Sequence, residues 1–199
     1  MDNNILPINV SDSGDYPYAG FWRRFGAFWL DFVIVLPWVV LLQYFNNLSR
    51  LGVFYTIIPS YVFFFIYSVY TVKRWGGTPG KLLVKIVIKR KNGKKCDWRE
   101  AILRESVLLA LGIPGAIASL VLTLQVSDQQ FASMTWMEFA EYRQLNMPEW
   151  HVPFYWGTQI WIWSEFLVLL IDKRKRALHD YVAGTVVIQR KFEKWAESG

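Results

Sequence analysis

Four long apolar runs limit what this chain can fold into. They occupy residues 25–45, 51–72, 101–125 and 154–171. A helix rises 1.5 Å per residue, so about 20 apolar residues cross a hydrocarbon core of roughly 30 Å. The first run has 21 residues and one charge, and the second has 22 residues and none. With 53% hydrophobic residues overall, the sequence predicts an all-α polytopic membrane protein with four transmembrane helices.

The basic residues are distributed unevenly around these runs. Of the 22 Lys and Arg residues, 20 lie in 23–24, 73–104 and 173–194, and only Arg50 and Arg143 lie elsewhere. Because basic residues mark the cytosolic side, we expect both termini to be cytosolic. The net charge of +6 is then explained by membrane topology. We expect these basic residues to bind anionic lipid headgroups, and we expect no nucleic acid as a partner.

The polar segments between the runs predict a small cytosolic β element. Residues 1–17 have few large apolar side chains and are expected to be flexible. The β-branched run before Asn92-Gly93 predicts a hairpin over 81–97, and Thr185–Gln189 predicts a third strand beside it. The membrane domain then covers 18–190. An outer loop over 126–153 is expected to carry a short interfacial helix, and 191–199 is expected to be a C-terminal tail.

Ionisable groups inside the runs are candidates for function. Asp31 and Glu165 each stand six residues inside the predicted cytosolic end of a run, so both lie roughly 9 Å deep. A carboxylate in hydrocarbon costs several kcal/mol or more unless it is paired, hydrated or protonated. We expect Asp31, Glu165 and Arg104 to face one another inside the bundle, with Glu105 and Arg24 beneath them.

Two interpretations of this predicted cluster remain open. Two carboxylates that share an arginine titrate as a coupled pair, one held ionised and the other raised toward neutral pH, so that a proton can exchange for a cation. The alternative is a structural salt bridge that fixes the register of the helices.

Two motifs resemble catalytic or cofactor sites without their full pattern. The stretch Gly76-Gly77-Thr78-Pro79-Gly80-Lys81 is too short for a phosphate loop, and Leu82 stands where a magnesium-binding Ser or Thr is needed. We interpret it as a glycine-rich turn. His179-Asp180 resembles a metal-binding pair, but His151, the only other histidine, is predicted on the opposite side of the membrane. We therefore expect no metal, no cofactor and no enzymatic catalysis, and we expect the pair to brace the turn before Thr185.

Several of these residues, in this order, form a family pattern. They are Ala19-Gly20-Phe21-Trp22-Arg23-Arg24 with Ala27 and Asp31, then Gly76 to Lys81, Arg104, Asp172, Ala177-Leu178-His179-Asp180 and Gly184-Thr185-Val186-Val187. The pattern resembles the RDD family of bacterial membrane proteins from Tyr18 to Arg190. The resemblance assigns the family arginine and aspartates to Arg24, Asp31 and either Asp172 or Asp180, with Gly77, Gly80 and His179 as further motif positions. Glu165 and the long aromatic outer loop depart from it.

The resemblance implies sodium/proton antiport, because that activity has been ascribed to some relatives. We therefore expect a multi-pass protein of the bacterial inner membrane that exchanges protons for monovalent cations. We also expect a homo-oligomer, since four helices make a thin wall for a water-accessible path. The alternatives are a non-transporting scaffold or assembly factor that docks a partner through its basic cytosolic element, and small-molecule or lipid handling between the helices.

Overall fold

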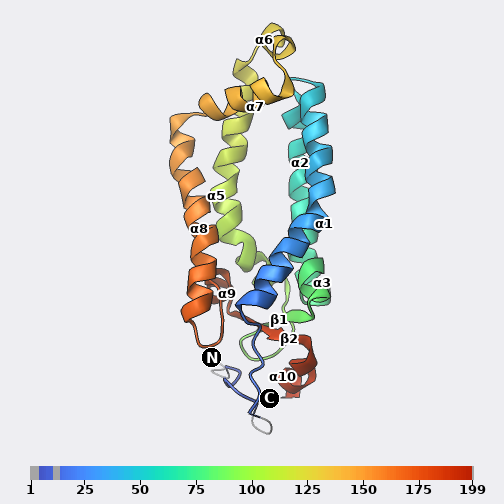
Figure 1. Ribbon diagram of the computed structural model, residues 1–199, viewed down its shortest axis with the longest axis vertical. Helices are drawn as coiled ribbons and strands as arrows, with labels where there is room; N and C mark the ends of the chain where they lie inside the picture. The colour runs from blue at the N-terminus through green and yellow to red at the C-terminus, as the bar shows by residue number, and fades with distance from the viewer. Residues whose placement is uncertain (1–4, 11–13, 199) are drawn as a thin grey trace. The chain divides into compact units, whose positions relative to one another are not determined.

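The computed structural model describes residues 5–10 and 14–198 (Figure 1). In the described part of the chain, four helical stretches are long and apolar enough to cross a membrane. They are Phe21–Leu48, Gly52–Trp75, Trp98–Gln125 and Glu149–Ile171. With one two-stranded sheet, they confirm the predicted fold class. Each stretch is longer than the apolar run that predicted it, because aromatic and polar residues at the ends of the run continue the helix.

The described residues divide into two compact units. Unit 1 is formed by Met1–Val35, Phe64–Val107 and Ile162–Gly199, and unit 2 by Leu36–Phe63 and Leu108–Trp161. The long helices α1 (Phe21–Leu48), α5 (Trp98–Gln125) and α8 (Val152–Ile171) each contribute residues to both units.

The sheet of unit 1 is buried on both faces. Strand β1 (Ile86–Arg90) runs antiparallel to β2 (Thr185–Gln189), with Ile86 opposite Gln189 and Arg90 opposite Thr185. Side chains alternate between the faces of a strand. Ile86 and Ile88 accordingly pack in one apolar cluster, and Val87 packs in another. Because an isolated two-stranded ribbon is marginally stable in water, this burial holds the sheet together.

The predicted hairpin over 81–97 is wrong, because its two halves do not form a pair of strands. Leu82 and Leu83 belong to helix α4 (Pro79–Leu83), and beyond the Asn92-Gly93 turn a single bridge joins Lys89 to Lys95. The predicted third strand Thr185–Gln189 is present and pairs with β1 along all five of its residues. Its apolar Val186, Val187 and Ile188 are fully buried, whereas the segment after the turn holds the exposed Lys94 and Lys95 and reaches the other edge of β1 only at the Lys89–Lys95 bridge.

Both ends of the described chain pack against this sheet. Leu6, expected to be flexible, is 4% exposed and donates its backbone N–H to Lys91 O at 2.8 Å; residues 1–4 and 11–13 of that segment lie outside the described part. The expected tail forms a 3₁₀ turn (Arg190–Phe192) and helix α10 (Glu193–Ser198). A Cβ at Gly93 would lie 1.8 Å from Ala196 O, and Gly93 has φ +82, so glycine is required where the turn meets α10.

Unit 2 contains the connection between α5 and α8. Within the predicted outer loop lie α6 (Asp128–Ser133) and α7 (Trp136–Leu145), followed by a 3₁₀ turn (Glu149–His151). Both α-helices begin with a capping box, formed by Ser127 with Gln130 and by Thr135 with Glu138. The remaining helix of unit 2 is α2 (Gly52–Phe64).

Helix α4 approaches α1 closely enough to exclude any side chain at Gly80. A Cβ there would lie 2.5 Å from Ala27 O and 2.7 Å from Asp31 N, both backbone atoms that cannot move away independently. Gly112 in α5, by contrast, has open space around its Cβ position.

We therefore predict that Gly80→Ala destabilises the protein by about 1–3 kcal/mol through overpacking. The matched change Gly112→Ala is expected to be neutral or to stabilise by about 0.5–1 kcal/mol, because alanine favours the helix. Thermal unfolding in detergent, followed by size-exclusion chromatography, measures both. Equal shifts for the two variants would contradict the packing argument.

Candidate functional site: a buried polar cluster in unit 1

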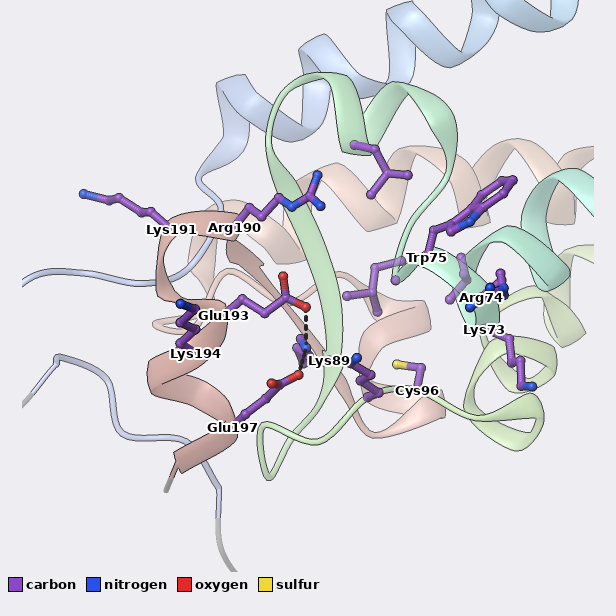
Figure 2. Close-up of a pocket in the computed structure, with 15 residues that line it drawn as sticks. Lys73, Arg74, Trp75, Lys89, Cys96, Arg190, Lys191, Glu193, Lys194 and Glu197 are labelled. Atoms are coloured by element: carbon purple, nitrogen blue, oxygen red, sulfur yellow. Dashed lines mark hydrogen bonds and ion pairs between the residues drawn. The ribbon is translucent and has the colours of Figure 1, made fainter.

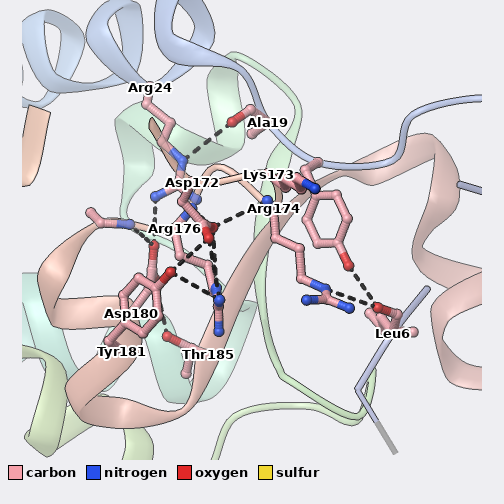
Figure 3. A network of polar contacts seen from close by, with 12 residues as sticks. Leu6, Ala19, Arg24, Asp172, Lys173, Arg174, Arg176, Asp180, Tyr181 and Thr185 are labelled. Carbon is pink, nitrogen blue, oxygen red and sulfur yellow. Dashed lines mark hydrogen bonds and ion pairs between the residues drawn. The ribbon is translucent and has the colours of Figure 1, made fainter. Parts of the chain in front are cut away.

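The centre of the cluster is Asp180 in α9 (Leu178–Ala183), whose side chain is fully buried. Arg24 Nη1 donates to Asp180 Oδ2 at 2.7 Å, and Arg104 Nη1 donates to Oδ1. Thr185 Oγ1 donates to Oδ1 at 3.0 Å, and the Ala177 N–H donates to Oδ2 at 3.0 Å. These contacts tie α1, α5, α9 and β2 together (Figure 3 shows the Arg24, Asp180 and Thr185 part). Of the His179-Asp180 pair that was predicted to brace the turn before Thr185, Asp180 makes the bracing contacts, and His179 contacts Glu165.

The two arginines keep Asp180 ionised. Burial by itself raises the pKa of this carboxyl, but the charges of Arg104 and Arg24 outweigh burial and hold the pKa well below its usual range. Asp180 therefore carries a negative charge at every physiological pH. It serves as a fixed counter-ion for two guanidinium groups.

A second pair extends the cluster into α8. His179 Nδ1 lies 2.6 Å from Glu165 Oε1, and His179 Nε2 lies 3.7 Å from Asp180 Oδ1. Within the described part of the chain, His179 Nε2 and Arg24 Nη2 are shielded from solvent and have no hydrogen-bond partner. Two shielded, unsatisfied nitrogens leave this part of the cluster with unused capacity for hydrogen bonding.

Asp31 occupies a different site. Its carboxylate accepts from Tyr67 Oη at 2.6 Å, Thr78 Oγ1 at 2.6 Å and the Gly80 N–H at 2.7 Å. Lys81 Nζ lies 4.0 Å away. Tyr67 belongs to a π-helical segment, Phe65–Tyr70, between α2 and α3 (Thr71–Trp75).

Lys81 is the basic group of the Asp31 site. Burial lowers the pKa of Lys81, while the charges of Asp31 and Glu105 raise it, and the net shift is downward. This ammonium is therefore held less firmly in its charged form than a surface lysine, despite its carboxylate neighbours.

Asp172 follows α8 and closes its own turn. Its Oδ2 accepts from the backbone N–H groups of Arg174 at 3.1 Å and Arg176 at 2.9 Å, and its Oδ1 accepts from Tyr181 Oη at 2.6 Å (Figure 3). Burial raises the pKa of Asp172, but the hydrogen bonds from Arg176 and Tyr181 dominate and bring it to about 2.

A model of the RDD family matches residues 18–184. The chain belongs to the RDD family. Together with the four apolar helices, this makes it a multi-pass membrane protein of the RDD type. No curated protein and no solved structure matches the chain.

The structure separates the two aspartates that were candidates for the second RDD position. Among the residues that the structure describes, Asp180 contacts Arg24 directly, whereas Asp172 binds groups of its own turn and the nearby Tyr181. The geometry therefore joins Arg24 to Asp180 and leaves Asp31 in a separate set of contacts. The motif residue Gly80 belongs to the Asp31 set, and His179 belongs to the Asp180 set.

The expected meeting is wrong for Asp31, whereas Glu165 and Arg104 do belong to one cluster, joined through His179 and Asp180. Asp31 binds the turn before α4, Arg104 binds Asp180, and Glu165 binds His179. The expectation failed because these side chains bind polar groups of the segments that connect the helices, such as Gly80, His179 and Asp180. Arg24 lies in the Asp180 set, and Glu105 is half-buried near Lys81.

Several partners of the site were missed by the sequence analysis. They are Tyr67, Thr78, Lys81 and Thr185. Thr78 had a usable signal, because a threonine before Pro79 is typical of a helix start. The others had none beyond their polarity. Among the described residues, no group of three or more His, Cys, Asp or Glu side chains could hold a metal ion.

We predict that Asp180→Asn destabilises the RDD protein by about 3–5 kcal/mol, because it leaves two buried guanidinium groups without a counter-charge. Asp128→Asn is the matched control: Arg50 Nε lies 2.7 Å from Asp128, the same distance as in the Arg24 pair, but Asp128 is 86% exposed. Its loss should cost less than about 1 kcal/mol. Thermal unfolding in detergent compares them.

The pH dependence of this difference follows from the lowered pKa of Asp180. A depressed folded-state pKa contributes stability that is complete above the unfolded pKa of about 4 and is lost only as pH falls through the folded value. The gap between wild type and Asp180→Asn should therefore not shrink as pH falls from about 8 to 5, and any proton gained by the neighbouring His179 can only widen it. A gap that closes within that range would contradict the assigned charge state.

Proposed function

We propose that this RDD protein exchanges protons for monovalent cations, and that the Glu165–His179 pair is its protonatable group. The observation that carries the proposal is the 2.6 Å contact between Glu165 Oε1 and His179 Nδ1, next to a permanently charged cluster. Glu165 lies six residues before the end of α8, roughly 9 Å inside a candidate span. An ionisable residue at that depth is a functional candidate by default.

The alternatives within the site are less suited to carrying a proton. Asp180 stays ionised because of its two arginines. The oxygens of Asp31 already accept hydrogen bonds from Tyr67, Thr78 and the Gly80 N–H. An imidazole, by contrast, can hold a proton on either ring nitrogen. His179 Nδ1 contacts Glu165, and Nε2 has no hydrogen-bond partner among the described residues, so the pair offers an exchangeable proton two positions.

Charge balance supplies a reason for exchange. Arg24 and Arg104 carry two positive charges, and Asp180 and ionised Glu165 carry two negative charges, so the set is neutral when His179 is neutral. Binding a proton at the pair adds one positive charge. A monovalent cation at the Glu165 carboxylate adds the same charge, so like-charge repulsion favours one occupant at a time.

The rival scaffold hypothesis loses part of its basis. It relied on the basic element that includes Lys89, Arg90, Lys94 and Lys95. Lys89 is 1% exposed and paired with Glu193 and Glu197, and Arg90 Nη2 lies 2.9 Å from Glu100. Half of the supposed docking residues are therefore engaged within the chain.

The transport prediction is tested in sealed proteoliposomes that contain a pH-sensitive dye and receive sodium, lithium or potassium outside. Glu165→Gln and His179→Gln are each expected to slow cation-driven proton release by at least about tenfold, as loss of a proton-transfer group does. His151→Gln, which changes the only other histidine, and Glu141→Gln, which changes an exposed acid in α7, should retain rates within about twofold of wild type.

Two results would count against the proposal. Wild-type protein that releases no protons with any of the three cations excludes the exchange. Folded Glu165→Gln and His179→Gln variants with wild-type rates would place proton coupling elsewhere in the protein.

The orientation proposed for this exchange places residues 23–24, 73–104 and 173–194 on the cytosolic side of the membrane, because they hold 20 of the 22 basic residues. We predict that green fluorescent protein fused after Gly199 fluoresces in a bacterial host. Alkaline phosphatase inserted after Asn146, in the connection between α7 and α8, should be active. The reverse pair of results would invert the topology.

A further inference from the structure

A cavity of about 800 Å³ opens in unit 1 beside the sheet (Figure 2). Its walls come from α3, β1, the segment around Cys96, the Arg190–Phe192 turn and α10. The lining contains seven basic and two acidic side chains. Apart from Lys89, the basic ones are Lys73, Arg74, Lys95, Arg190, Lys191 and Lys194.

The two acidic residues are already paired. Figure 2 shows Lys89 between Glu193 and Glu197, with its Nζ 2.7 Å from a carboxylate oxygen of each. This triad, in which Lys89 is buried and the two glutamates are partly exposed, carries one negative charge. The other six basic residues outweigh it, so the cavity has a formal charge of +5.

Most of the remaining basic groups are available to a ligand. Lys73 lies 5.2 Å over the Trp98 ring, and Lys191 lies 4.5 Å over the Phe192 ring. Across the described residues, Arg74, Lys95, Arg190 and Lys194 have no ion-pair partner. Like charges gathered around one space repel each other, and an anion in that space relieves the repulsion.

We propose that this cavity binds a phosphate-bearing anion. Guanidinium and ammonium groups form short, strong, charge-assisted hydrogen bonds with phosphate oxygens. The volume lies within the range of about 300–1,000 Å³ that small-molecule sites occupy. Cys96 lines the cavity but is no nucleophile, because burial raises the pKa of its thiol to about 12.

The phosphate can come from a lipid headgroup or from a soluble compound. Lys73, Arg74 and Trp75 are the last residues of the candidate span Gly52–Trp75, and basic and aromatic residues at the end of a span lie at headgroup level. This position gives a headgroup direct access. The exposed Lys194 and Arg190 on the α10 side give access to a soluble phosphate.

The site is separate from the Glu165–His179 pair and does not depend on the proposed exchange. Five of its lining residues, from Arg190 to Glu197, lie beyond the part of the chain that the RDD family model matches. The proposal therefore concerns this chain and not a property common to the family.

The test uses the full-length purified protein in detergent. The removal variant is Arg74→Gln/Lys95→Gln/Lys194→Gln, three exposed cavity residues. The matched control, Lys91→Gln/Lys94→Gln/Arg99→Gln, removes the same charges from exposed positions outside the cavity. Native mass spectrometry measures bound phosphatidylglycerol, with phosphatidylcholine as the neutral lipid, and isothermal calorimetry measures glycerol 3-phosphate as the soluble probe.

The removal variant is expected to bind at least one of the two anionic probes about tenfold more weakly than wild type, while the control stays within about twofold. If the removal variant binds only phosphatidylglycerol more weakly, the cavity is a lipid site. If it binds glycerol 3-phosphate more weakly, the phosphate group itself is the ligand. Equal losses in both triple variants, or no loss in either, overturn the proposal. If the removal variant does not fold, Arg190→Gln should still weaken binding by about threefold, and its wild-type binding would overturn the proposal as well.

Discussion

The contact on which unit 1 depends is the carboxylate of Asp180 between Arg24 and Arg104. It joins α1 and α5 to α9 and, through Thr185, to β2. Removing charges from water costs several kcal/mol per ion, and only close opposite charges and complete hydrogen bonding offset that cost. One carboxylate cannot balance two guanidinium groups. The excess positive charge is met by Glu165, which reaches the cluster through His179. The Asp180 ion pairs and the Glu165–His179 contact are therefore parts of one electrostatic arrangement.

The two carboxylates inside the apolar helices, Asp31 and Glu165, have different binding partners because of backbone geometry. Gly80 has no side chain, so α4 approaches α1 until the Gly80 N–H points at Asp31. Thr78 and Tyr67 complete that site, and Asp31 becomes an anchor for the turn. Glu165 meets an imidazole instead of backbone donors. A carboxylate fixed by several donors favours one charge state, whereas a carboxylate beside an imidazole can share a proton with it. This difference in environment is why we assign Asp31 a structural role and Glu165 the proposed chemical one.

Sequence patterns predicted the parts of the fold that depend on local chemistry. Apolar run lengths located the four helices, and β-branched residues located β1 and β2. Thr185–Gln189 was expected beside β1 and is its partner, but the second strand of the predicted hairpin is reduced to one bridge, because Asn92-Gly93 signals a turn and not the length of the strand that follows it. Asp31 and Glu165 were placed at one depth, but depth along a helix does not fix the direction in which a side chain points around a bundle. That direction depended on connecting residues such as Gly80 and His179.

The sheet relates the polar cluster to the basic cavity. Lys89, whose side chain lines the cavity, pairs with Val186 in the ladder, and Val186 follows Thr185, which hydrogen-bonds to Asp180. Both sites are thus anchored to neighbouring positions of one ribbon. Energetic coupling between sites requires an element with two arrangements that both sites bias. The ribbon is buried on both faces and its five paired positions are continuous, so it offers one arrangement. It therefore acts as a common rigid frame: the proposed anion site is built on the ladder itself, whereas Glu165, the proposed proton carrier, lies on α8 outside the ladder.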